Sequence, residues 1–225
     1  MNNQNTKKVL LVMSVVMLFS LTACKDKGKN HYKNYVKSLI AINYLGAGDD
    51  YKDTGASKQD AEALYESNME YFADQIISYY NVTLSDASTM RDEYVKLAKN
   101  IYSKVNYSVS APYQNGDTYF VDVTIYPIDI FNQTYDDVYN YVSDFNTGVQ
   151  NGDYNSYTLE QYETEFSTGL LNILNTAYID VKYADPVTIT VEIIEDGNSF
   201  YISDADFQAI DAAMIAAGKP ANPEE

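Results

Sequence analysis

The chain of 225 residues contains one cysteine, one histidine and no tryptophan. A single cysteine excludes an internal disulfide and a paired redox motif. Because histidine, cysteine and paired carboxylates supply most general acid–base, nucleophilic and zinc chemistry, the scarcity of the first two removes the usual routes to such sites. The chain also lacks the HExxH, CxxC, GxSxG, GxGxxG and Walker-type patterns. We therefore expect no cofactor and assign no catalytic residue.

Basic charge is also scarce. The chain has 15 lysine and arginine residues against 32 acidic residues, which gives a formal net charge of −17. An acidic surface repels phosphate backbones and anionic lipid headgroups, which argues against nucleic-acid binding and against a basic surface lying on a membrane. Solubility is the simpler explanation of the excess, and recognition of a basic partner is the alternative.

The N-terminus has the three parts of a signal peptide. Residues 7–8 are basic, residues 9–20 form an apolar core, and residues 21–24 read LTAC. A membrane-spanning helix needs roughly 20 apolar residues, and charged residues follow too soon for one here. LTAC resembles the lipobox of bacterial lipoproteins, in which a peptidase cuts before a cysteine that already carries diacylglycerol. The resemblance implies lipid on Cys24, palmitate among its acyl chains, and a protein held on the outer face of the cell membrane. An ordinary secretory signal or an uncleaved anchor is the alternative.

Cleavage before Cys24 sets the expected domain organisation. The predicted parts are a signal peptide (1–23), a lipidated tether (24–30), an α+β domain (31–219) and a disordered tail (220–225). The mature chain keeps 13 basic and 32 acidic residues, so its formal charge falls to −19. The order helix, helix, hairpin occurs twice, which leaves open two similar halves, about 31–130 and 131–219.

Helical periodicity of apolar residues recurs along the domain. It predicts helices over residues 32–43, 64–79, 90–105, 134–149, 162–178 and 203–215. The expected N-caps are Ser57 with Asp60, Ser85, Thr134 with Asp137, Thr158 with Gln161, and Ser203 with Asp206. The expected C-terminal ends are Gly46, Asn81 and Gly152.

Two segments change to a period of two and predict β-hairpins. The first spans residues 107–125 around Asn115-Gly116, and the second spans residues 187–202 around Asp196-Gly197. Because proline cannot donate to a strand ladder, Pro112 predicts an edge position for the first strand. Hairpins of this size must share a sheet or a helix layer, so we predict an α+β fold with helices on an antiparallel sheet.

The lipobox, the long opening helices and the strand ending VTIYPID at residues 123–129 are together similar to uncharacterised lipoproteins of Gram-positive anaerobes. Those proteins are similar in outline to cystatin-like and nuclear-transport-factor-2-like α+β folds. The resemblance carries no catalytic residue to this chain, because the group has no assigned activity.

Individual polar residues offer few candidate sites. His31 reads as a solvated residue at the start of the first helix. The loop with Asp49, Asp50 and Asp53 and the turn at 195–198 offer oxygen ligands for calcium, but neither has EF-hand spacing, and solvated loops are the simpler interpretation. Four acidic residues fall in predicted first helical turns, where the helix dipole favours negative charge: Asp136, Asp137, Asp204 and Asp206.

Tyrosine is the compositional anomaly, with 23 copies. Core packing explains most of them, because the ring packs while the hydroxyl reaches a partner or water. Four others fall in predicted loops or at strand ends and are candidates to line a cleft for a sugar or peptide: Tyr51, Tyr113, Tyr154 and Tyr157.

Two functional hypotheses remain. The favoured one is a non-catalytic, lipid-anchored module that binds a protein, peptide or glycan of the cell envelope. The alternative is a small hydrolase or isomerase with a carboxylate or tyrosine in the concave face of the sheet, for which Asp122 and Glu192 are the candidates. The solvent face of a one-sided sheet explains these two acids more simply. An enclosed pocket around either acid would favour the enzyme.

Overall fold

The computed structural model describes residues 30–46, 50–85, 87–197 and 199–219, and confirms the α+β class. Cys24, the rest of the signal segment and the tail therefore lie outside the described residues. The helices are α1 (Asn30–Ile40), α2 (Lys58–Tyr79), α3 (Ala87–Tyr102), α4 (Ile130–Gln133), α5 (Tyr135–Asn151), α6 (Leu159–Ala177) and α7 (Asp204–Met214). In the described part of the chain, no helix is long and apolar enough to cross a membrane.

The strands form one antiparallel sheet. They are β1 (Asn106–Val109), β2 (Tyr113–Asn115), β3 (Thr118–Tyr126), β4 (Val187–Asp196) and β5 (Ser199–Tyr201). The order is β1-β3-β4-β5, and β2 also pairs with β3. The two central strands therefore come from the two hairpins that the sequence predicts, so segments from both suggested halves share one sheet. Whether the halves arose by duplication stays a prediction.

Pro112 lies at the edge of the sheet, as predicted, and it divides the first strand into β1 and β2. Ser110 maintains contact with β3 across the break. Its N–H donates to the carbonyl of Asp122, and its hydroxyl accepts from the N–H of Asp122, each at 2.9 Å. A side chain thus replaces a backbone group where proline ends the regular ladder.

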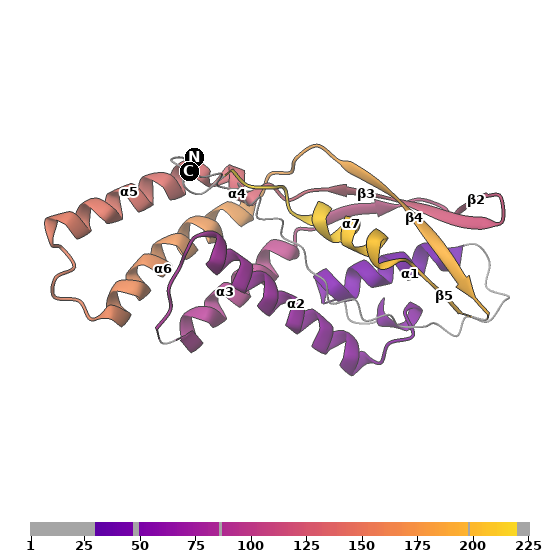
Figure 1. Cartoon of the computed structure of the whole chain (residues 1–225), viewed down its shortest axis with the longest axis horizontal. Coiled ribbons are helices and arrows are strands. Elements are labelled where there is room, and N and C mark those ends of the chain that lie inside the picture. The colour runs from indigo at the N-terminus through magenta and orange to yellow at the C-terminus, as the bar shows by residue number, and fades with distance from the viewer. Residues whose placement is uncertain (1–29, 47–49, 86, 198, 220–225) are drawn as a thin grey trace, which may run out of the picture.

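The two faces of the sheet differ in polarity. Alternate residues of β3, from Val121 to Ile125, point into the core and pair with Ile189, Val191 and Val187 across β4. Helices α1 and α7 cover this inner face (Figure 1). The outer face carries polar pairs, including Thr124 and Thr188, whose hydroxyls lie 3.0 Å apart. The sheet is one-sided, with a solvated outer face.

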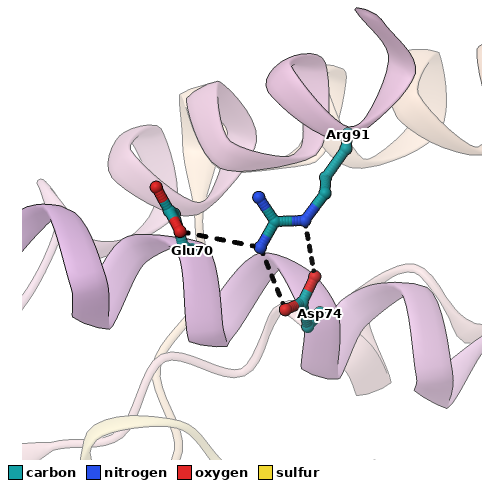
Figure 2. Close-up of polar contacts among 3 residues, drawn as sticks. All are labelled: Glu70, Asp74 and Arg91. Carbon is teal, nitrogen blue, oxygen red and sulfur yellow. Dashed lines mark hydrogen bonds and ion pairs between the residues drawn. The ribbon is translucent and has the colours of Figure 1, made fainter. Parts of the chain in front are cut away.

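Helices α2 and α3 pair in antiparallel fashion and pack against the segment that follows α1, residues 41–45. Figure 2 shows Arg91 of α3 against two acids of α2. Its guanidinium donates to both carboxylate oxygens of Asp74 at 3.0 Å each, and lies 3.8 Å from Glu70. Lys99, two turns further along α3, contacts Glu66 at 2.7 Å. These contacts help to fix the position of α3, against which α6 packs.

Helices α5 and α6 form a hairpin at one end of the molecule, while the sheet with α1 and α7 lies at the other (Figure 1). Gly169 of α6 admits the ring of Tyr141 from α5 so closely that a Cβ there would lie 2.1 Å from Cζ. The Tyr141 hydroxyl donates to the carbonyls of Glu165 and Phe166 at 3.1 Å each. A glycine thus allows the two helices of the hairpin to approach each other.

Most predicted helix ends are confirmed. Ser57, Thr158 and Ser203 each accept from the N–H three residues on, and Thr158 with Gln161 forms a complete capping box. Gly46 and Gly152 end helical segments with positive φ, at 58° and 83°. The first helix differs from a simple α-helix in its last residues, Ala41–Leu45, which form a π-helical turn.

The prediction for Thr134 is wrong. Thr134 stands at the start of α5, but its hydroxyl does not cap that helix. It donates instead to the carbonyl of Ile130, 2.8 Å away in the short helix α4. Because α4 immediately precedes α5, the carbonyl of Ile130 lies one helical turn before Thr134 and within reach of its hydroxyl. Ser85 donates its hydroxyl to Glu163 on α6, and its predicted role as the N-cap of the next helix stays a prediction.

Candidate functional site

A cavity of about 700 Å³ lies where the α5–α6 hairpin meets the end of α2 and the segment that follows it. Such a volume is within the range of small-ligand sites. Its lining residues are Tyr80, Asn81, Thr83, Val138, Tyr139, Val142, Ser143, Phe145, Asn146, Thr147, Gln150, Tyr162, Glu163, Phe166 and Leu170. In Figure 1 these three segments lie at the end of the molecule away from the β2 hairpin.

The floor of the cavity is apolar because α5 and α6 turn their packed faces toward it. Val138, Phe145 and Leu170 are buried, at helical spacing on their two helices. Phe145 packs against Phe166 and Tyr162, with ring centroids 5.0 and 5.2 Å apart. Several aromatic rings therefore come together at the base of the cavity.

The rim is polar and uncharged. Ser143, Asn146, Thr147 and Gln150 lie on the exposed face of α5 that borders the cavity. Their amide and hydroxyl groups both donate and accept hydrogen bonds. An apolar floor with a polar rim is typical of sites that bind amphipathic ligands, such as sugars and peptides.

Glu163 is the charged residue of the lining. It is only 7% exposed, although it lies on a helix of the hairpin. Its carboxylate accepts from the N–H of Ser85 at 2.6 Å and from the Ser85 hydroxyl at 2.9 Å. A buried carboxylate must be hydrogen-bonded to be tolerated, and these two bonds join α6 to the segment before α3.

Tyrosines near the cavity are held in their neutral form. Burial raises the pKa of Tyr80 above its ordinary value, although the Thr134 hydroxyl nearby works against the shift. Burial also raises the pKa of Tyr141 to about 12. Burial likewise raises the pKa of Tyr94 to about 12, with the Ser167 hydroxyl opposing the shift. These phenols remain hydrogen-bond donors at physiological pH.

The two candidate acids of the enzyme hypothesis lie elsewhere, on the outer face of the sheet. Asp122 accepts from Thr190 at 2.8 Å and from Tyr113 at 3.1 Å, and Glu192 is exposed. Neither acid lines the cavity, and they lie on the solvated face rather than in a concavity. The arrangement is that of a one-sided sheet, with Asp122 stabilised by cross-strand hydroxyls.

The four loop tyrosines do not meet in a cleft. Tyr51 packs against the main core, and Tyr113 stacks on Phe120 with 5.9 Å between centroids. Tyr154 and Tyr157 pack on each other at the tip of the hairpin, with centroids 5.3 Å apart. None of the four lines the cavity, to which Tyr80, Tyr139 and Tyr162 contribute their rings instead.

The remaining candidates are also separate from the cavity. His31 is half-buried, with its ring 5.0 Å from that of Phe200. Asp49 and Asn198 of the two calcium candidates lie outside the described residues, and Glu195 accepts a hydrogen bond from Tyr32. Within the described ranges, no three potential ligand side chains cluster in a way that would hold a metal ion. The acids at 136–137, 204 and 206 do lie in first helical turns.

Sequence reasoning missed Glu163 and its contact with Ser85. The available signal was weak: Glu163 lies three residues before Phe166 and seven before Leu170, so it falls on the apolar stripe of the predicted helix. A charged residue on such a stripe indicates a buried partner, but the sequence does not show which one. Ser85 is 78 residues away in the chain, and only the packing of α6 beside α3 brings the two together.

Comparison with known proteins finds a likeness in structure but none in sequence family. No family model matches the chain, and no curated protein matches it. A solved structure does match: a protein of Bacillus subtilis strain 168 described as a "putative lipoprotein (ycdA)", at 18% sequence identity and a TM-score of 0.54. The match covers 83% of this chain and 56% of that chain, so this chain spans little more than half of the Bacillus protein. At this identity the likeness shows a shared fold.

Proposed function

We propose that this protein is a lipid-anchored, extracellular binding module whose ligand occupies the cavity between the α5–α6 hairpin and the end of α2. The observation that carries the proposal is the cavity itself, with its aromatic floor and its uncharged polar rim. The polar groups suit a peptide or glycan of the cell envelope, since both offer amide or hydroxyl groups on a partly apolar frame.

Anchoring through Cys24 is supported by the LTAC lipobox and by the description of the Bacillus protein of similar fold as a lipoprotein. Two acyl chains suffice for stable membrane attachment, since each buried methylene contributes about 0.8 kcal/mol. The closer likeness, to lipoproteins of Gram-positive anaerobes with a cystatin-like or nuclear-transport-factor-2-like outline, stays a prediction.

The anchor would point the cavity away from the membrane. The described chain begins six residues after Cys24, and a segment of that length reaches at most roughly 20 Å. At the start of α1, Tyr32 donates to Glu195 beside the β4–β5 turn, at the opposite end of the molecule from the tip of the α5–α6 hairpin (Figure 1). The proposed ligand is therefore one that lies in the envelope beyond the bilayer surface.

Ligand binding is tested with the mature chain, residues 24–225 with Cys24→Ser, against panels of envelope glycans and peptides by calorimetry. Ser143→Trp places an indole on the rim and should abolish binding. Asn140→Trp is the matched control, because Asn140 is exposed on the same helix but does not line the cavity. Ligands that bind both variants equally well would contradict the proposed site.

Anchoring is tested separately with the full precursor in a bacterial host. We expect the unmodified chain to incorporate labelled palmitate and to sediment with membranes. Cys24→Ser should lose the label and be released. Retention of both the label and the membrane fraction by Cys24→Ser would contradict lipidation at this residue.

A further inference from the structure

We propose that the ligand of this cavity carries a positively charged nitrogen, either a quaternary ammonium or the primary ammonium of a lysine-type side chain. The inference rests on the proposed function, since it names the chemical class that the same cavity selects. It is argued from the charge of the lining, the burial of Glu163 and the aromatic rings around it.

Glu163 is the one charged residue among those that line the cavity, and none of the lining residues is basic. Lys219 lies near the start of the hairpin instead, with its ammonium 4.9 Å from the centroid of the Tyr135 ring. The sequence has no lysine, arginine or histidine between Lys104 and Lys182, a stretch that includes both helices of the hairpin. The hairpin carries acids along its length, including Asp136, Asp144 and Glu165. Because low-dielectric walls focus the field of nearby charges, such a cavity concentrates cations and repels anions.

Glu163 supplies a negative charge at the cavity wall. The residue is more than nine-tenths buried, and the two partners that the described residues give its carboxylate are neutral groups of Ser85. A carboxylate has about four lone-pair positions, so two remain for a further donor. Buried charges in proteins are normally balanced by an opposite charge, which an ammonium ligand would provide.

Five aromatic rings line the same cavity, on the α2 end and on both helices of the hairpin: Tyr80, Tyr139, Phe145, Tyr162 and Phe166. The face of an aromatic ring is negative and attracts a cation held over it, more strongly when water is excluded. Rings combined with a buried carboxylate are a suitable environment for an alkylated or primary ammonium. A neutral ligand of the same shape would gain the packing but not the electrostatic attraction.

The two sources of such a group are distinguished with matched probe pairs on the mature chain, residues 24–225 with Cys24→Ser. Choline is compared with its neutral isostere, in which carbon replaces the nitrogen. Nα-acetyl-lysine amide is compared with Nα-acetyl-norleucine amide. We expect at least one cation to bind tenfold or more tightly than its neutral partner by calorimetry, and salt to weaken that preference. The choline pair reports a quaternary ammonium, and the lysine pair a peptide amine.

Variants of the lining residues test whether the cation binds in the cavity. Ser143→Trp should remove cation binding, and Asn140→Trp should leave it unchanged, which excludes general attraction to an acidic protein. Glu163→Gln should reduce the preference for the cation over its neutral partner. Tyr162→Leu should also reduce it while keeping the Glu163 contact with Ser85, so the test does not depend on one variant folding.

The outcomes separate the two proposals. In one outcome, the neutral probes bind as tightly as the cations, and Ser143→Trp abolishes the binding of both kinds of probe. That result would overturn the cation preference but leave the cavity as the binding site. Binding of neither cation would also overturn the preference. If envelope ligands bind the Ser143→Trp variant as tightly as the unmodified chain, the proposed function itself is overturned.

Discussion

The hydroxyl of Tyr44 donates a 2.6 Å hydrogen bond to Oδ1 of Asp211, and both residues are buried. Tyr44 lies in the π-helical turn after α1, and Asp211 lies on α7, so the bond joins the first and last described helices. Burial, together with the nearby Asp211, raises the pKa of Tyr44 well above its ordinary value, which keeps the hydroxyl a donor. The ring of Tyr102, which is also buried, packs with its centroid 5.3 Å from that of Tyr44.

Replacing Tyr44 by phenylalanine should destabilise the protein by about 1.5–3 kcal/mol, because a buried carboxyl group loses a hydrogen bond. The free energy of unfolding is measured by urea denaturation followed by circular dichroism. Tyr139→Phe is the control, because Tyr139 is 50% exposed and its hydroxyl can bond to water. Equal midpoints for Tyr44→Phe and the unmodified chain would show that the bond contributes nothing.

Gly169→Ala should destabilise the α5–α6 hairpin, although alanine is the better helix former by about 1 kcal/mol. The new methyl would force the Tyr141 ring out of place and break its hydrogen bonds to the two carbonyls of α6. We expect a net loss of about 1–3 kcal/mol, as for other overpacked sites. In a Tyr141→Ala background the same change should cost much less, which a double-mutant cycle records as a large coupling energy, and simple additivity of the two changes would contradict the clash.

Arg91→Lys should cost less than about 1 kcal/mol, because the two-point contact with Asp74 is lost while the charge is kept. The contact is partly exposed, so salt should reduce the difference between the two proteins. Thermal unfolding of both proteins at low and at high salt measures this difference in stability. A difference that stays constant as salt is added would indicate packing of the Arg91 stem rather than charge.

Alkaline pH should unfold the protein through its buried tyrosines. Burial raises the pKa of Tyr35, Tyr94 and Tyr141 from 10.0 to about 12. Because the unfolded chain loses these protons first, the stability they confer is complete below pH 10 and falls as the pH rises toward 12. Tyrosinate absorbance and circular dichroism are followed together. Exposed tyrosines should titrate first, and a second rise in absorbance should coincide with unfolding; a single titration near pH 10 with the fold intact would contradict this.

Local signals accounted for much of the fold. Thr158 and Gln161 are three residues apart, so their capping box depends on one turn of backbone and could be predicted from sequence. The helix end at Gly152 and the turn at Asp196-Gly197 could also be predicted, because each glycine adopts a positive φ that few other residues tolerate. Thr134 shows the limit of such patterns, because the unpredicted helix α4 offered its hydroxyl a nearer acceptor.

The candidate site was beyond sequence reasoning because its parts are distant in the chain. Asn43 and Asn68, which fall within the predicted helices 32–43 and 64–79, are buried, and the Asn68 amide donates to the Asn43 side chain at 2.9 Å, a pairing that helical periodicity does not specify. Glu163 and Ser85 are a second such pair. Periodicity predicts which face of a helix is covered but not which helix covers it, since that depends on packing of the whole chain.

The sequence by itself determined the scarcity of histidine and cysteine, the acidic charge, the lipobox-like LTAC at residues 21–24, and the order of most helices and hairpins, because composition and short-range spacing decide each of these. Only the tertiary structure decided that the candidate acids Asp122 and Glu192 lie on the solvated face of the sheet. It also decided that a cavity forms beside the α5–α6 hairpin, with Glu163 buried at its wall. The physical reason is that burial of a polar group requires partners, and those partners come from segments that meet only when the chain is folded.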